Sequence, residues 1–115
     1  MNLKYIFKIV DKDEWDNAKK IGVYSGSATD IKDGYIHFSE KEQIYDTLKK
    51  YYHKKENLLL LKVDTLNLNH LFWEQASNGD MYPHLYSVLD IKSVKKEFEL
   101  ALDQNGIHNV PNLTS

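Results

Sequence analysis

Hydrophobic runs and the polar residues between them divide the first third of the chain into a strand, a helix and a loop. The apolar and β-branched run from Tyr5 to Val10 predicts a first strand. Asp11 or Asp13 then supplies a helix cap, and Gly22 supplies a stop, so we expect a helix between them. Residues 23–33 carry serine and glycine turn signals and predict a loop.

The rest of the pattern adds a second helix and several strands. Residues 35–38 predict a strand, and Ser39 with Glu42 forms a capping-box pair that predicts a helix from Ser39 to about His53. The unbroken apolar run from Leu58 to Val63 is typical of a central strand covered on both faces. Further strands are expected over residues 68–74, 84–89 and 96–102.

This order of elements predicts one α+β domain with two helices packed on a mostly antiparallel sheet. The domain is expected to span residues 1–102, and residues 103–115, which hold Gly106 and Pro111, are expected to form a flexible C-terminal tail. A chain of 115 residues is long enough to bury a single core without disulfides or a structural metal.

Composition narrows the class of partner. The net charge is −2 with both signs mixed along the chain, so we expect neither DNA nor a membrane as partner. The chain has no cysteine, which excludes disulfides and a thiolate nucleophile, and no secretion signal or long apolar run, so a cytoplasmic location is expected. All 15 basic side chains are lysines, so an anionic ligand must be held by lysine, histidine or backbone N–H groups.

One candidate site centres on His37. Strand alternation places Tyr35, His37 and Ser39 on one face, while Ile36 and Phe38 face the core. Ser39 stands at the expected start of a helix, where free N–H groups suit an anionic ligand. The alternative is that His37 is a structural histidine with its hydrogen bonds satisfied, and that Ser39 is only a helix cap.

A second histidine lies in a similar setting. His84 and Tyr86 follow the loop over residues 75–80, and Glu74 precedes that loop. A loop that gathers histidines, a carboxylate and aromatic rings is typical of a pocket rim, so His37 and His84 are expected on one side of the domain with Glu74 close by. The alternatives are a solvated Glu74 and a core role for Tyr86. No spacing typical of histidine metal ligands is present, and we expect no metal site.

In combination, the opening strand at residues 5–10, the segment DGYIHFS at 33–39 and the segment 73–86 resemble the bacterial domain-of-unknown-function 952 family. The resemblance covers residues 5 to 102, nearly the whole chain. That family is similar in fold to the ADP-ribosyltransferases and their RNA 2′-phosphotransferase branch. The resemblance therefore implies an ADP-ribosyltransferase-like fold.

The same resemblance implies a pocket for NAD, ADP-ribose or a related nucleotide, with ADP-ribosyl transfer or NAD hydrolysis as the reaction. NAD is expected as a substrate or ligand, and no resident cofactor is expected. Catalytic roles are implied for His37 and Glu74. Ligand-binding roles are implied for Lys8, Tyr24, Ser27, Ser39, His84 and Tyr86. The alternative is a non-catalytic binding or interaction module, because Lys8 stands where that superfamily carries a histidine.

Overall fold

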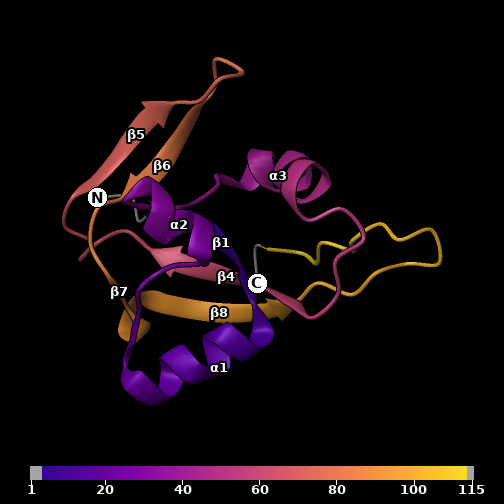
Figure 1. Cartoon of the computed structure of the whole chain (residues 1–115), viewed down its shortest axis with the longest axis horizontal. Coiled ribbons are helices and arrows are strands. Elements are labelled where there is room, and N and C mark those ends of the chain that lie inside the picture. Colours follow the sequence, from indigo (N-terminus) through magenta and orange to yellow (C-terminus); the bar gives the residue numbers. More distant parts are fainter. Residues whose placement is uncertain (1–3, 114–115) are drawn as a thin grey trace.

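Two three-stranded sheets and one two-stranded sheet, all antiparallel, organise the part of the chain that the computed structural model describes, residues 4–113 (Figure 1). The strands are β1 Tyr5–Asp11, β2 Val23–Tyr24, β3 Ile36–His37, β4 Leu58–Asp64, β5 Leu71–Gln75, β6 Met81–Leu85, β7 Leu89–Asp90 and β8 Val94–Glu99. The α-helices are α1 Lys12–Ile21, α2 Ala28–Asp33 and α3 Ile44–Tyr51, and short 3₁₀ helices cover Lys41–Gln43 and Ile91–Ser93.

The largest sheet has the order β1-β4-β8, with the predicted strand over residues 58–63 at its centre. A second sheet has the order β3-β6-β5, and its β5–β6 hairpin projects at the upper left of Figure 1. The third pairs β2 with β7. Backbone hydrogen bonds of 2.8 Å in both directions between Phe7 and Ser39 join β1 to the segment after β3. This bridge sets Lys8, the next residue of β1, close to the second sheet.

The core lies on both faces of the largest sheet. Alternation along β1 turns Ile6 and Val10 towards Trp15 of α1, and turns Phe7 and Ile9 towards α3. The two helices therefore cover opposite faces, as Figure 1 shows. The central strand β4 is buried on both sides, which explains why its sequence is apolar in succession.

The first helix, α1, begins and ends at the cap and stop residues that the sequence predicted. The side chain of Asp11 accepts hydrogen bonds from the N–H groups of Asp13 and Glu14, at 2.9 and 3.1 Å. Gly22 ends the helix in the left-handed region, at a φ of 102°, where a residue with a Cβ is strained. The predicted first strand and first helix are confirmed.

Two local predictions were wrong. Residues 23–33 are not a loop, because they contain strand β2 and helix α2. The helix expected from Ser39 begins later, with a 3₁₀ turn capped by Glu40, and ends at Tyr51 rather than His53. Glu40 and Gln43 make the reciprocal capping bonds, so the capping box is one residue further along than the sequence pattern indicated.

The α+β class and the antiparallel pairing are confirmed, but the expectation of one sheet and two helices was wrong. The later strands are shifted from the expected ranges: β5 starts at Leu71 rather than at residue 68, and β8 ends at Glu99 rather than at residue 102. The range expected for one strand at 84–89 is divided between the end of β6 and the start of β7.

The C-terminal segment, expected to form a tail, packs against the domain over its described part, 103–113; residues 114–115 lie outside the described residues. Leu113 is 7% exposed and belongs to the core cluster under α3. Nζ of Lys62 donates to the carbonyl of Leu113 at 3.0 Å, and Nε2 of His108 lies 2.7 Å from the carbonyl oxygen of Lys55. No helix within residues 4–113 is long and apolar enough to cross a membrane.

Candidate functional site

Two histidines lie side by side where β3 pairs with β6. The antiparallel register places His37 opposite His84, and their ring centroids are 5.5 Å apart. The ring of Tyr35 stacks on that of His84 at 4.2 Å and lies 4.6 Å from that of His37. The prediction that both histidines face the same side is confirmed, because directly opposite residues of paired strands point to one face.

Glu74 on the neighbouring strand β5 orients His84. Its Oε1 lies 2.8 Å from Nδ1 of His84 and accepts a hydrogen bond of 2.5 Å from the hydroxyl of Tyr86. Because an ionised carboxylate only accepts hydrogen bonds, Nδ1 of His84 is the donor and carries a proton. The bonds from Tyr86 and His84 lower the pKa of Glu74, and the bond to Glu74 raises the pKa of Tyr86 to about 12.

His37 lies between two carboxylates of helix α2. Its Nδ1 is 2.6 Å from Oδ1 of Asp30, and its Nε2 is 3.1 Å from Oδ2 of Asp33. The backbone N–H of His37 also donates to Asp30, at 3.2 Å. Both ring nitrogens are thus engaged, although about a third of the side chain, 35%, is exposed. The ring is therefore held in one orientation at the surface of the cluster.

Asp30 connects His37 to Lys8. Its carboxylate is 2% exposed and lies 3.0 Å from Nζ of Lys8, whose side chain is 4% exposed. Burial alone would raise the pKa of Asp30. The hydrogen bond from His37, the charge of Lys8 and the N–H of Ser27 outweigh burial and hold that pKa well below its usual range. Asp30 is therefore ionised, and it satisfies the buried Lys8 ammonium.

Asp30 reaches this position because it also caps α2. Oγ of Ser27 accepts from the N–H of Asp30 at 3.1 Å, and Oδ2 of Asp30 accepts from the N–H of Ser27 at 2.9 Å. Gly34 then ends the helix with a φ of 88°, and the chain turns directly into β3. Sequence analysis missed Asp30, although Ser27 followed three residues later by Asp30 is a capping-box pattern that could have revealed it.

Several predicted site residues lie outside the histidine cluster. Tyr24 is a core residue whose ring lies 6.0 Å from that of Trp15, and burial raises its pKa. Ser39 is buried, with its Oγ 3.0 Å from Oγ1 of Thr47. Ser27 serves as the α2 cap, and Lys8 serves as the partner of Asp30. Of the predicted residues, the structure brings four into direct contact, namely His37, Glu74, His84 and Tyr86.

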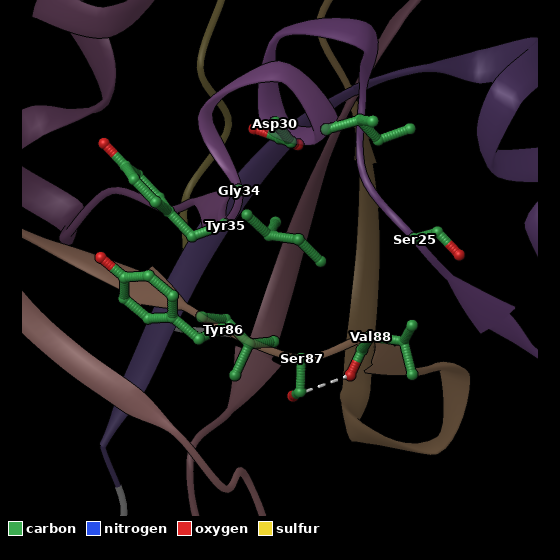
Figure 2. Close-up of a pocket in the computed structure, with 10 residues that line it drawn as sticks. Ser25, Asp30, Gly34, Tyr35, Tyr86, Ser87 and Val88 are labelled. Carbon is green, nitrogen blue, oxygen red and sulfur yellow. Dashed lines mark hydrogen bonds between the residues drawn. The ribbon is translucent and has the colours of Figure 1, made fainter.

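An open pocket of about 310 Å³ adjoins this cluster (Figure 2). Its walls come from the α2–β3 segment on one side and from the segment after β6 on the other. The lining residues are Ser25, Asp30, Ile31, Gly34, Tyr35, Ile36, Leu85, Tyr86, Ser87 and Val88. Figure 2 shows the rings of Tyr35 and Tyr86 lying next to each other at one side of the pocket. Both rings belong to the pocket and to the histidine cluster.

The pocket is therefore mainly aromatic and apolar, with one carboxylate and no lysine in its lining. Such a lining suits a flat, uncharged or cationic ring rather than a free phosphate. Within residues 4–113, no three His, Asp or Glu side chains are grouped so that they could hold a metal ion.

The fold and the cluster define a class: a small α+β protein of antiparallel sheets that carries two carboxylate-held histidines on paired strands. The family described as "Protein of unknown function (DUF952)" matches residues 9–97. The chain belongs to this family, as the sequence resemblance indicated. No curated protein matches the chain at a significant level.

Solved structures of the protein CC0527 from Caulobacter crescentus are similar over almost the entire chain. The crystal structure is 40% identical, with a TM-score of 0.87, over 92% of this chain and 94% of that chain. The solution NMR structure is 42% identical, with a TM-score of 0.80, over 93% of this chain and 91% of that chain. The similarity therefore extends over nearly the whole of both chains.

Proposed function

We propose that the chain binds the nucleoside part of NAD, ADP-ribose or a related nucleotide beside the two histidines, and that it hydrolyses or transfers the ADP-ribosyl group. One observation carries the proposal: His37 and His84, each held by its own carboxylate, lie together next to an aromatic pocket. The resemblance to the ADP-ribosyltransferases supports the same ligand class.

The aromatic side chains supply the surface for a ring. Tyr35 and Tyr86 lie with their ring centroids 5.1 Å apart, and Phe72 lies 6.0 Å from Tyr86. Tyr86 and Phe72 are 42% and 53% exposed, so a ligand ring can reach their faces. A base stacked on such a platform gains about 1–3 kcal/mol per ring.

Charge favours the ribosyl end of the ligand over its phosphates. Lys8, for which the resemblance implies a ligand-binding role, is buried in an ion pair with Asp30, and no lysine lines the pocket. Asp33 and Glu74 add negative charge beside the histidines. A positively charged nicotinamide ring on ribose fits these surroundings better than a pyrophosphate does.

The proposed reaction breaks the bond between ribose C1′ and the nicotinamide nitrogen, whose electron pair leaves with nicotinamide. Glu74 uses Oε1 for His84 and Tyr86, and its Oε2 is available to stabilise the positive charge that develops at C1′. His37 orients the ribose. Water, or an acceptor hydroxyl, then adds at C1′ and releases a proton.

A second candidate is a non-catalytic module that binds the same ligand class without the reaction. The buried Lys8–Asp30 pair favours it, because Asp30 holds the Lys8 ammonium and leaves it unavailable to a bound anion. The two candidates share the pocket and differ in whether NAD is consumed.

Calorimetry with NAD, ADP-ribose and nicotinamide riboside tests the binding. We expect heat with NAD and with nicotinamide riboside, and we expect that heat to be lost in His37→Ala. The control is His53→Ala, which replaces an exposed histidine after the end of α3 and should bind normally. No heat with any of the three at millimolar concentration would refute the ligand class.

Chromatography of NAD after long incubation separates the two candidates. If the chain is an enzyme, Glu74→Gln should lower the turnover of NAD and leave the affinity for NAD nearly unchanged. The control is Glu99→Gln, which replaces an exposed residue of the edge strand β8 and should change neither quantity. NAD that binds and stays intact in the wild type supports the module.

A further inference from the structure

We infer that His84, rather than His37, accepts the proton released at C1′ and is a further catalytic residue. The inference rests on the proposed function and gives a catalytic role to His84, for which the sequence analysis implied ligand binding. It follows from which ring nitrogens have partners, from the strand register and from the burial of the two rings.

His84 presents one unpartnered nitrogen. Its Nδ1–H donates to Glu74, so in the neutral ring Nε2 holds a free electron pair. Within residues 4–113, no hydrogen-bond partner is found for Nε2 of His84. The only fully buried side-chain nitrogen or oxygen without a partner in that range is Nε1 of Trp15. Nε2 of His84 therefore reaches the surface, although the side chain as a whole is only 9% exposed.

His37 lacks such a nitrogen. Asp30 faces its Nδ1 and Asp33 faces its Nε2, so neither nitrogen is open to a water molecule at C1′. The more exposed of the two histidines is thus the less available as a base. Its place between two carboxylates holds the ring fixed, which suits contact with the ribose rather than proton transfer.

The arrangement around His84 is that of an oriented base. Glu74 fixes the tautomer from one side, as a carboxylate does for a catalytic histidine, and the stacked ring of Tyr35 fixes the plane of the imidazole. The titratable groups that face His84 are Glu74 from β5, His37 from β3, Tyr35 and Tyr86.

In the step itself, the water oxygen forms a bond to C1′ as the C1′–N bond breaks. Nε2 of His84 takes the water proton, and the resulting imidazolium keeps its Nδ1–H bond to Glu74. The products are ADP-ribose, nicotinamide and one proton, which His84 passes to solvent.

NMR of ¹⁵N-histidine-labelled protein tests the tautomer without any ligand. We expect His84 to carry its proton on Nδ1 at mildly alkaline pH, and Glu74→Gln to mix the two tautomers. A proton on Nε2 of His84 in the wild type would overturn the inference. Diethyl pyrocarbonate mapped by mass spectrometry supplies a second measurement: His84 should react in the wild type, and bound NAD should protect it, while exposed His70 reacts in both conditions.

The pH dependence of NAD turnover tests the step. His84→Asn should lower kcat by about 10²- to 10⁴-fold and remove the acidic limb of the profile, while His37→Asn should weaken binding and retain that limb. Should His84→Asn fail to fold, Glu74→Gln must shift the same limb. If His84→Asn and Glu74→Gln both turn over NAD with an unchanged acidic limb, this inference is wrong and the proposed function still stands. If the wild type neither binds nor turns over NAD, both the inference and the proposed function are wrong.

Discussion

Replacing Lys8 by methionine leaves the Asp30 carboxylate in the core without its cation. The two side chains are 4% and 2% exposed and lie 3.0 Å apart, so little water can enter to replace the lost charge. Methionine has nearly the volume and length of lysine and creates no large cavity. The substitution therefore isolates the electrostatic contribution of the pair.

The expected cost follows from what remains around Asp30. Breaking a buried pair by removing one partner costs about 3–5 kcal/mol. Asp30 would keep its hydrogen bonds from the N–H of Ser27 at 2.9 Å and from Nδ1 of His37 at 2.6 Å. These bonds stabilise the charge, so we expect a loss at the lower end, about 3 kcal/mol.

Urea unfolding at neutral pH, followed by tryptophan fluorescence and circular dichroism, measures this loss. The matched control is Lys12→Met, which breaks an exposed pair with Glu99, 3.6 Å apart and 45% and 78% exposed. We expect the control to lose only about 0–1 kcal/mol. An equal dependence on urea in the three proteins would show that the denatured states are alike.

The reasoning fails if Lys8→Met costs no more than Lys12→Met. That outcome would mean that water or a rearranged side chain compensates Asp30 in the folded state. A loss near 3 kcal/mol is a large share of the roughly 5–15 kcal/mol that holds a domain folded, so the melting temperature should fall by roughly 10–15 °C.

Two further predictions concern stability. The pKa of Asp30 is lower in the folded than in the unfolded chain, so its contribution to stability is present above its ordinary pKa of 3.8 and is lost as pH falls. The free energy of unfolding should therefore drop below about pH 4 in the wild type and drop less steeply in Asp30→Asn. Urea unfolding at a series of acidic pH values measures this difference, and equal slopes in the two proteins would contradict it. Leu113→Ala should lower the free energy of unfolding by about 2–5 kcal/mol because Leu113 is in the core. Its control, Leu66→Ala, replaces a residue that is 60% exposed and should change stability by no more than about 0.5 kcal/mol. Equal losses in the same urea assay would contradict the packing of the C-terminal segment.

Elements with a strong local signal could be predicted from the sequence. The apolar run of β4 and the cap and stop of α1 are properties of a few neighbouring residues, and tertiary packing agrees with them. The same holds for His37 and His84, since strand alternation fixes which face each side chain takes once Ile36 and Leu85 are placed in the core.

The parts that failed depend on contacts distant in sequence. Lys8 shares a face of β1 with the core residues Ile6 and Val10, but its partner Asp30 lies in residues 23–33, whose turn residues predict a loop. Leu113 lies beside Asn109, Pro111 and Asn112 without any periodicity, so only the tertiary structure shows that it reaches the core.

The shortness of β3 has a consequence for folding as well as for chemistry. This strand has two residues, and its register with β6 places His37 opposite His84. A slip of one residue would turn His37 into the apolar core and expose Ile36 or Phe38, and burying an imidazole without a partner costs about 1–3 kcal/mol. His37 thus disfavours the misaligned pairing of β3 with β6. A chain in which the two histidines lie side by side therefore also has these two strands in the correct register.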